Sequence, residues 1–350
     1  MTLVSGIPSP AIAAIAAGRR RRHRRHATAS IVLGVLVAVV FALSLTIGNT
    51  FYTPSEVLGV LLGQPVPGAS FTVGELRLPR AITGALAGVS FGIAGVTFQT
   101  MLRNPLASPD IIGISTGASA AAVFGIVALS LSDAAVSLFA LAGALLTALT
   151  IYLLSFKGGF AGTRLILIGI GIAAMLQSVI SYQLSRAADW DIQAAMQWLT
   201  GSLNSASWEK LPPLLLACLI IVPVMLSRQR SLSVLRLGDD SAAGLGVRVS
   251  ATRLALIIGA VALLAFATAA AGPIAFVAFM AGPIAARITG PGANLLVPSA
   301  LVGALLVLVA DLVGQFAFEG RYPVGVVTGI LGAPYLIYLL IRTNRTGGSL

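Results

Sequence analysis

Charged residues are scarce in this 350-residue chain, where Asp, Glu, Lys and Arg together make up only 9% of the sequence. A soluble globular domain carries about 25% charged residues, so this chain has too little polar surface to fold as a water-soluble globule. The same composition excludes intrinsic disorder, because 57% of the residues are hydrophobic and the mean hydropathy is +0.97. The sequence therefore predicts an all-α, polytopic membrane protein.

Cysteine and histidine are nearly absent as well. The single cysteine, Cys218, excludes an internal disulfide framework. The two histidines, His23 and His26, lie in a run of arginines, so a metal site built from several histidines is not expected. The chain has no Walker A lysine motif, and its apolar segments hold no His, Cys or paired-acid constellation. We therefore expect no nucleotide site, no catalytic site, no metal and no cofactor on this chain.

Long stretches without Asp, Glu, Lys or Arg divide the sequence. A membrane-crossing helix needs about 20 apolar residues, because each residue rises about 1.5 Å through a hydrocarbon core about 30 Å thick. The stretch 254–286 is too long for one crossing, and Gly272-Pro273 predicts a break in it, because proline lacks a backbone donor. Counting it as two crossings gives ten helices over residues 31–341. The stretches are 31–55, 81–102, 111–132, 134–156, 165–185, 211–227, 254–286, 288–310 and 322–341.

The distribution of basic residues predicts the orientation. With the N-terminus in the cytoplasm, seventeen of the 22 Lys and Arg residues fall in cytoplasmic segments, as the positive-inside rule requires. This bias supports ten crossings with both termini in the cytoplasm, a flexible basic tail over 1–30 and a second tail over 342–350. The abundance of arginine, alanine and glycine indicates a bacterial origin and hence the bacterial inner membrane. Contact with anionic lipid accounts for the net charge of +11, so no nucleic-acid partner is implied. The five basic residues outside are Arg77, Arg80, Arg186, Lys210 and Arg321.

Polar residues in the outer segments are candidates for function, because they are the costly exceptions in a membrane protein. Arg77 and Arg80 share one face at the start of the second helix, where Pro79 suits the first turn. They act either as interface anchors or as a cationic patch for an acidic external partner. All three tryptophans lie within 186–210, which predicts a short helix along the outer surface with a break at Gly201-Ser202.

Asp311 is the one carboxylate well inside an apolar segment, near the outer end of the ninth helix. We expect it to make a gating or structural hydrogen bond rather than to couple protons, because no second buried acid or histidine accompanies it. The second helix ends near Gln99 in a turn shaped by Asn104 and two prolines. Gly113 and Gly117 follow this turn and are interpreted as positions of close helix packing.

The largest inner loop, 228–253, contains a short segment of small residues. Asp239 or Asp240 can cap a short helix there, and Gly244 or Gly246 can end it. The small side chains at Ala242 and Ala243 leave one side of this helix bare. The pattern favours a peg that docks into a soluble cytoplasmic partner, and a purely structural loop is the alternative.

Together these segments resemble the FecCD family of ABC-transporter permeases, which import iron–siderophore, haem and cobalamin complexes. The resemblance covers nearly the whole chain from about 31 to 341, with its motifs in the family's order and on the expected sides of the membrane. The motifs are RLPR at 77–80, GVTFQTMLRNPLASPDIIGISTGA at 95–118, WLTGSL at 198–203, LGDDSAAGLGV at 237–247, GPIAFVAF at 272–279, AD at 310–311 and YPVGVVTGILGAPYLIYLL at 322–340.

The resemblance implies the fold of a type II ABC importer permease and a transporter of several parts. A second permease subunit, identical or paralogous, completes the pathway, and two cytoplasmic ATPase subunits bind ATP and Mg²⁺ and grip the inner loops. An external substrate-binding protein delivers the ligand. In this family the short inner helix sits in a groove of the ATPase, and it matches Gly238, Asp239, Asp240, Ser241, Ala242, Ala243, Gly244, Leu245 and Gly246. The outer arginines that meet the binding protein match Arg77 and Arg80, with Arg321 as a third candidate. Candidates for the pathway or its gate are Gln99, Asn104, Gln177, Gly272, Pro273 and Asp311.

Two positions depart from the family's pattern. An arginine is usual four residues after the aspartate of the AD motif, where this chain has Gln315, and Arg321 is an alternative source of that charge. Pro-His is frequent where this chain has Gly282-Pro283. Because the pathway carries few charges, a large chelated cargo is expected, an Fe(III)–siderophore first, with cobalamin or haem as alternatives. An ion-coupled secondary transporter is a further alternative, and it would depend on Asp311.

Overall fold

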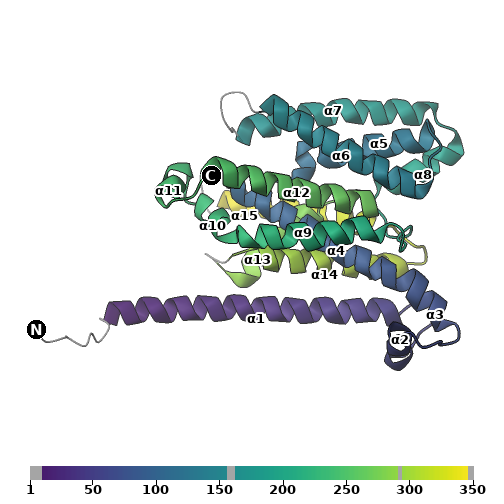
Figure 1. The fold of residues 1–350 in the computed structure, drawn as a ribbon, viewed down its shortest axis with the longest axis horizontal. Helices are drawn as coiled ribbons and strands as arrows, with labels where there is room; N and C mark the ends of the chain where they lie inside the picture. Colours follow the sequence, from purple (N-terminus) through teal and green to yellow (C-terminus); the bar gives the residue numbers. More distant parts are fainter. Residues whose placement is uncertain (1–9, 156–161, 291–293, 346–350) are drawn as a thin grey trace, which may run out of the picture.

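The structure is a computed structural model that describes residues 10–155, 162–290 and 294–345, and within these ranges it contains helices and short connections without a β-strand. The long helices run along one common direction, so that their connections gather at two ends (Figure 1). The elements are α1 (Pro10–Thr46), α2 (Pro54–Leu61), α3 (Ala69–Phe71), η1 (Thr72–Arg77), α4 (Leu78–Met101), η2 (Pro109–Ile112), α5 (Ile114–Val127), α6 (Asp133–Ser155), α7 (Gly162–Arg186), α8 (Asp189–Leu199), α9 (Leu211–Ser227), α10 (Gln229–Leu235), α11 (Asp239–Gly244), α12 (Val249–Ala271), α13 (Val277–Thr289), α14 (Leu296–Phe316) and α15 (Val324–Arg345).

Seven of the described helices are long and apolar enough to cross a membrane. The number rises to eight if α9 and α10, which meet at an angle of 54°, form one bent span. Two further apolar helices, α5 and α13, are shorter, with 14 and 13 residues. The predicted break at Gly272-Pro273 is confirmed, because α12 ends at Ala271 and α13 begins at Val277.

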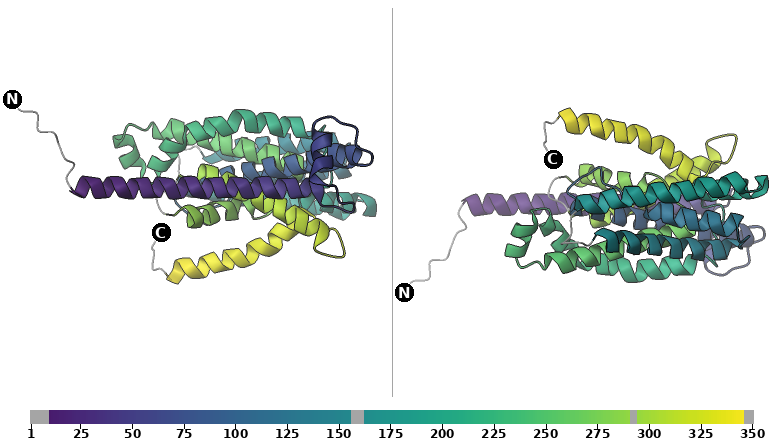
Figure 2. Two further views of the ribbon diagram at one scale, coloured as in Figure 1. Left: turned by 90° about the horizontal axis from the view of Figure 1, so that it is seen from below. Right: turned by 90° about the horizontal axis from the view of Figure 1, so that it is seen from above.

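The two ends of the bundle hold different elements. α10 and α11 lie at one end, together with the beginning of α1 and the end of α15, and this end is called the inner end (Figures 1 and 2). α2, α3 and α8 lie at the opposite end, called the outer end. The predicted short helix among the tryptophans is confirmed as α8, and it is followed by a connection that begins at Gly201.

α4 forms the centre of the bundle and packs against α12, α13 and α14. Glycines allow its backbone to approach theirs directly. A Cβ atom at Gly88 would overlap the carbonyl oxygen of Gly303, and one at Gly95 would overlap that of Ala278. Gly117 plays the same part between α5 and α6, where a Cβ atom would overlap Thr147, as predicted. Close van der Waals packing of this kind holds helices together in lipid, where no hydrophobic force acts between them.

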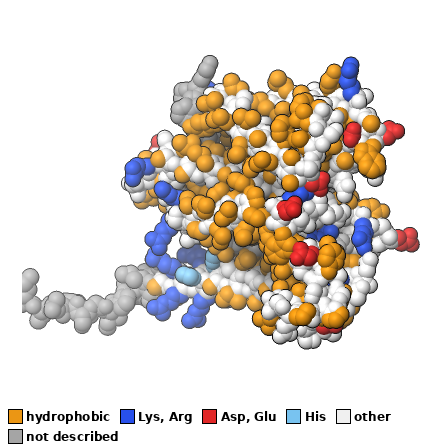
Figure 3. All heavy atoms as spheres, turned by 45° about the vertical axis from the view of Figure 1, so that its right-hand side comes forward, with side chains coloured by type: hydrophobic (Ala, Val, Ile, Leu, Met, Phe, Trp, Pro, Cys, Tyr) orange, Lys and Arg blue, Asp and Glu red, His pale blue; other side chains and the backbone are white. Residues whose placement is uncertain are grey.

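The basic N-terminal segment is helical over its described residues. α1 has 37 residues and is therefore about 55 Å long, well beyond the thickness of a bilayer core. Its arginine-rich beginning continues past the bundle, and basic side chains gather there (Figures 1 and 3). The flexible tail predicted over 1–30 is thus wrong for residues 10–30, because alanine and arginine are strong helix formers and no proline interrupts them after Pro10. Arg25 Nε and Nη2 donate to Ile288 O at 3.3 and 3.2 Å, which ties this segment to the end of α13.

The second membrane helix begins earlier than predicted. It is continuous from Ala69 to Met101, and η1 within it is a π-helical turn. Pro79 lies in the first turn of α4, as predicted, but α4 continues directly from the π turn before it. In a π turn the residue at position 79 would donate its N–H to the carbonyl of Gly74, and proline has no such donor. The indole Nε1 of Trp208 donates to Gly74 O at 3.0 Å instead, so the outer connection supplies the missing hydrogen bond.

Candidate functional site

Two sequence motifs meet near the outer end through an ion pair. The guanidinium of Arg80 on α4 donates from Nε and Nη2 to the two carboxylate oxygens of Asp311 on α14, each at 2.8 Å. Gln315, one turn further along α14, donates to Asp311 Oδ2 at 2.7 Å. The side chain of Asp311 is only 9% exposed and that of Arg80 is 20% exposed. Asp311 thus makes the structural hydrogen bonds predicted for it, and its charge is balanced by an arginine that sequence reasoning assigned to a different role.

Arg77 caps the C-terminal end of α1. Its guanidinium donates to the carbonyl oxygens of Leu45 and Thr46 at 2.9 and 3.0 Å. It also donates to Thr50 O at 2.7 Å and lies 5.1 Å from the centre of the Tyr52 ring. The carbonyl groups at a helix C-terminus lack intrahelical partners and attract a cation. Arg77 therefore fixes the fold at this end, which sequence reasoning did not foresee.

Arg321 lies in the connection between α14 and α15. Its side chain is exposed at the outer end and donates to Asn49 Oδ1 at 3.1 Å. Of the three arginines predicted to meet an external partner, Arg77 and Arg80 are engaged within the chain, and only Arg321 is exposed.

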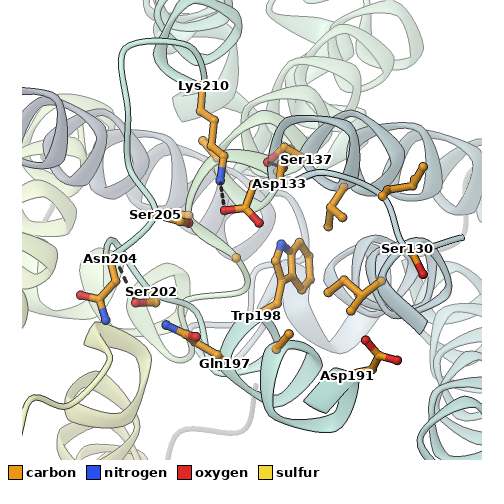
Figure 4. A pocket seen from close by; sticks show the side chains of 18 of the residues that line it. Ser130, Asp133, Ser137, Asp191, Gln197, Trp198, Ser202, Asn204, Ser205 and Lys210 are labelled. Atoms are coloured by element: carbon orange, nitrogen blue, oxygen red, sulfur yellow. Dashed lines mark hydrogen bonds and ion pairs between the residues drawn. The ribbon is translucent and has the colours of Figure 1, made fainter. Parts of the chain in front are cut away.

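A cavity of about 540 Å³, called the outer cavity, lies between α6, α8 and the end of α12. Figure 4 shows the ring of Trp198 at its centre and polar side chains around it. Lys210 Nζ lies 3.3 Å from Asp133 Oδ2 and links the connection before α9 to the start of α6. Gly272, one of the predicted pathway residues, lines this cavity.

Three glycines from three different motifs meet where α12 ends. Gly201 and Gly272 have φ angles of +72° and +71°, which favour glycine. A Cβ atom at Gly272 would lie 2.7 Å from Trp198 O, and one at Gly201 would lie 2.6 Å from Pro273 O. Gly325 N, at the start of α15, donates to Gly201 O at 3.1 Å. The break after α12, the connection after α8 and the start of α15 thus form one tight contact, called the glycine junction.

A second cavity, of about 630 Å³, borders the same break and is called the central cavity. Its lining is mostly apolar, and the predicted residues Gln177, on α7, and Pro273 both belong to it. Leu336 on α15 also lines it, so α7 and α15 face a common space. Phe276, in the break, has a φ of +63°, an uncommon conformation for a residue with a side chain, and it contributes to the wall.

Hydroxyl groups form a polar strip along one wall of the central cavity. They belong to Ser108, Ser115, Thr116 and Ser119. Asp110 lies among them and accepts hydrogen bonds from Ser115 Oγ at 2.9 Å and Ser108 Oγ at 3.2 Å. Burial raises the pKa of Asp110, and the two hydroxyl groups oppose that shift. Sequence reasoning did not single out this strip. Within the described ranges no three His, Cys, Asp or Glu side chains group around a possible metal position.

A third cavity, of about 310 Å³, lies toward the inner end between α4 and α13 and is called the inner cavity. The predicted residues Gln99 and Asn104 line it. Gln99 Nε2 donates to Phe279 O at 2.9 Å, so this amide joins α4 to α13. Asn104 Oδ1 accepts from Leu106 N at 2.8 Å and shapes the predicted turn. A Cβ atom at Gly282 would overlap the Gln99 side chain, which explains a glycine at this departure from the family pattern.

The predicted short helix of the inner loop is present as α11, and Gly246, with a φ of +82°, follows its end as expected. Its cap differs from the prediction. Gly238, with a φ of +107°, is the N-cap, and neither Asp239 nor Asp240 caps the helix through its side chain. Both aspartates lie within the first turn because the helix begins at Asp239, and the Asp239 carboxylate is bound by Arg253 and Arg103 instead.

The two alanines of α11 face opposite ways. Ala242 is fully buried against the chain, whereas Ala243 is exposed, so the bare side predicted for both is formed by Ala243 alone. Leu245, directly after the helix, is 64% exposed. The residues of this segment that are open to solvent are Asp239, Asp240, Ser241, Ala243, Gly244, Leu245 and Gly246.

The described chain is an apolar helical bundle with one broken helix, and cavities lie beside the break. A short helix is exposed at one end. Together these features are typical of a membrane permease. The chain belongs to the FecCD transport family, which matches residues 35–342. It is 40% identical to the achromobactin transport system permease protein of Dickeya dadantii, over 89% of this chain and 90% of that protein. It is 39% identical to the ferric enterobactin transport system permease protein of Escherichia coli, over 83% of this chain and 88% of that protein.

A solved structure shows the same arrangement of helices. It is described as a metal-chelate type ABC transporter in an inward-facing conformation, and its match has a TM-score of 0.79 at 26% identity, over 88% of this chain and 98% of that one. The chain is therefore a multi-pass permease subunit of the cytoplasmic membrane, of the family whose members serve ABC transporters.

Proposed function

We propose that this chain is the membrane-spanning subunit of an ATP-driven importer of Fe(III)–siderophore complexes. The observation that carries the proposal is the central cavity, which is large, mostly apolar and lined with hydroxyl groups along one wall. A bare metal ion would bind to carboxylates or imidazoles, whereas a bulky chelate needs volume and a few hydrogen-bonding groups. The cargo in the names of the two relatives, achromobactin and ferric enterobactin, supports the same choice.

Ten crossings with both termini in the cytoplasm fit this function. Ten described helices are apolar and 13 or more residues long: α1, α4, α5, α6, α7, α9, α12, α13, α14 and α15. The beginning of α1 and the end of α15 lie at the inner end, as an even number of crossings requires (Figure 1). The arginines at the start of α1 then face the anionic lipid headgroups of the cytoplasmic leaflet.

The cargo would pass from the outer cavity, past the glycine junction, into the central cavity and toward the inner end. Gly272 lines the outer cavity and Pro273 the central one, so the broken helix stands between the two spaces. Broken helices at membrane depth occur where they border a cavity or protein interior. Asp311 is unsuited to ion coupling in this scheme, because Arg80 and Gln315 occupy both of its oxygens.

Partners complete the transporter. A cytoplasmic ATPase dimer, which holds ATP and Mg²⁺, would receive α11 with its exposed Ala243 and Leu245. An external binding protein would dock at the outer end, where Arg321 offers an exposed cation to an acidic partner. A second permease subunit would cover α7 and α15, which both border the central cavity.

The first experiment is purification of this chain from its native membrane in mild detergent, followed by reconstitution in liposomes with the proteins that stay bound. We expect an ATPase with Walker motifs in equal stoichiometry, and uptake of radiolabelled ferric siderophore that requires ATP. Cobalamin and haem serve as competing cargoes in the same assay.

Two results would contradict the proposal. Uptake of cobalamin or haem in place of every ferric siderophore tested would show that the cargo is wrong. Uptake that survives ATP depletion and collapses when the proton gradient is dissipated would show that the chain is a secondary transporter.

A further inference from the structure

The carboxylate of Asp239 is shared by two arginines, one on α12 and one in the turn that follows α4. Arg253, in the second turn of α12, donates from Nη2 to Oδ1 at 2.8 Å and from Nη1 to Oδ2 at 3.1 Å. Arg103, in the turn that follows α4, donates from Nη2 to Oδ1 at 3.0 Å. Paired N–H donors of this kind fix the direction as well as the distance between two groups. The first residue of α11 is thereby attached to the inner ends of α4 and α12 at once.

The two arginines differ in their surroundings. The side chain of Arg253 is only 10% exposed, whereas those of Arg103 and Asp239 are 49% and 47% exposed. Hydrogen bonds from Arg253 hold the pKa of Asp239 below its usual range, so the carboxylate stays ionised at neutral pH. The contact to Arg253 is therefore the anchored part of the cluster, and the contact to Arg103 is the accessible part.

The backbone at Arg103 is unusual. Its φ is +51°, in the left-handed region that costs a residue with a side chain about 1 kcal/mol or more. The same turn contains Asn104, whose side chain accepts a hydrogen bond from Leu106 N within the turn. Arg103 and Asn104 both line the inner cavity. The turn therefore joins the ion cluster to the wall of a cavity within a few residues.

The two helices that are connected through Asp239, α4 and α12, also carry or adjoin residues of the other candidate sites. α4 carries Gln99, which is hydrogen-bonded to Phe279 O on α13. α12 ends at Ala271, directly before Gly272 in the glycine junction between the outer and central cavities. A displacement of α11 along the bundle would thus act on the inner cavity through α4 and on the glycine junction through α12.

We infer that Asp239, Arg103 and Arg253 form a coupling triad that transmits movement of α11 to α4 and α12. These are positioning residues, because they act through the helices that they connect. The inference rests on the proposed function, in which α11 is the contact for the ATPase. It predicts that weakening the triad leaves the transporter assembled and hydrolysing ATP while uptake falls.

The test compares Arg103→Gln and Asp239→Asn with the unmodified chain, each purified as the full complex with its ATPase and binding protein and reconstituted in liposomes. Arg248→Gln is the matched control, because Arg248 is an exposed arginine of the same inner segment. The measured quantity is the number of cargo molecules taken up per ATP hydrolysed. We expect both triad variants to lose about fivefold or more in this ratio, the smallest usual coupling effect. Arg103→Gln, which lies outside α11, should in addition keep stoichiometric ATPase. The control should match the unmodified chain.

The double variant Arg103→Gln/Asp239→Asn tests whether the residues act together. Its ratio should equal that of Asp239→Asn, because removal of the shared carboxylate already breaks both contacts. An unchanged ratio in Arg103→Gln, which removes a half-exposed side chain, would overturn the inference while the proposed function stands. Failure of the unmodified chain to retain an ATPase or to use ATP would overturn both.

Discussion

At the scale of single residues, the partly buried charges near the outer end, Arg77, Arg80 and Asp311, are held in an ion pair or a helix cap. A lone ion in an apolar interior costs several kcal/mol, so its partner is part of the structure. Arg80 and Asp311 form such a pair, and Arg77 uses the carbonyl groups at the end of α1. Arg77 and Arg80, which the sequence marks as candidates for docking, therefore hold the outer ends of α1, α4 and α14 in place.

Neutralising one partner of the outer ion pair is expected to destabilise the protein. Arg80→Gln and Asp311→Asn should each lower the free energy of unfolding by about 3 kcal/mol, because each leaves a largely buried charge without its counter-ion. In the double variant Arg80→Gln/Asp311→Asn, the free energy of unfolding should fall by less than the sum of the two single-variant decreases, because no unpaired charge remains. Unfolding in detergent micelles, followed by circular dichroism, measures these differences.

Glu319→Gln is the control for this pair, because Glu319 is an exposed acid at the same end. It should change the free energy of unfolding by less than about 0.5 kcal/mol. Strictly additive losses in the double variant would show that Arg80 and Asp311 do not depend on each other.

At the scale of elements, glycine contacts decide how the broken helix is held. α12 and α13 are separated by a non-helical segment, and the glycine junction connects that segment to the start of α15. The junction depends on direct backbone contact, which leaves no space for a side chain.

Gly325→Ala is expected to disrupt the junction. The added methyl group would overlap the carbonyl oxygen of Thr200, a backbone atom that cannot rotate away. We expect a loss of about 1 to 3 kcal/mol in the free energy of unfolding, as for other overpacked sites, together with reduced uptake. Gly34→Ala on α1 is the control, because a Cβ atom there meets nothing within 4 Å and alanine favours a helix. Equal stability of Gly325→Ala and Gly34→Ala would contradict the tight contact.

Substitution of the two alanines of α11 should have opposite effects on ATPase binding and on the stability of the fold. Ala243→Trp should leave the fold intact, because the side chain is exposed, but should weaken ATPase binding about tenfold or more by filling the bare side. Ala242→Trp should instead destabilise the fold by about 1 to 3 kcal/mol, since this side chain is fully buried. Titration of the ATPase against the detergent-solubilised chain separates the effects. Normal ATPase affinity in Ala243→Trp would remove α11 from the binding surface.

At the scale of the whole molecule, two helices have large uncovered faces on either side of the central cavity. Within their most apolar windows only 17% of α7 and 28% of α15 is buried, compared with 78% for the helix that contains α4. α1 and α6 are similarly open, at 11% and 22%, but neither borders the central cavity. Figure 2 shows α15 diverging from the rest of the bundle. Gly171 on α7 and Gly329 on α15 have no atom within 4 Å of an added Cβ, so nothing within the described chain requires a small residue there. Small residues on a bare membrane helix allow close approach of another helix.

A cysteine at position 171 should therefore cross-link to a second permease subunit. The variant Gly171→Cys/Cys218→Ser carries a single thiol, because Cys218 is the only native cysteine. A short cross-linker with a maleimide at one end and a photoreactive diazirine at the other, which inserts into a neighbouring C–H or N–H bond after loss of N₂, should produce a linked pair of subunits on illumination of the membranes, with the partner identified by mass spectrometry. Leu146→Cys/Cys218→Ser places the thiol on the exposed side of α6 and should stay unlinked. Equal cross-linking of both variants would contradict a specific interface at α7.

The sequence by itself determined the class of protein, the positions of the apolar helices, the break at Gly272-Pro273 and the short helices α8 and α11. These features depend on local properties, namely hydropathy over about 20 residues and the backbone chemistry of glycine and proline. The boundaries were less certain, because nothing local separates Arg19–Arg25 from the helix that follows, or Pro79 from the π turn before it.

Only the tertiary structure decided which residues are partners. Arg80 and Asp311 are 231 positions apart, and Arg103 and Asp239 are 136 positions apart. Such pairs depend on which helices are neighbours and on how each is rotated about its axis, and hydropathy is too uniform in these helices to determine either. For the same reason the sequence could not tell that Ala242 is buried and Ala243 exposed, or that Gln99 joins α4 to α13. The sequence marked Gln99, Asp239 and Asp311 as candidates, but Arg103, Arg253 and the hydroxyl strip emerge only from the contacts of the folded bundle.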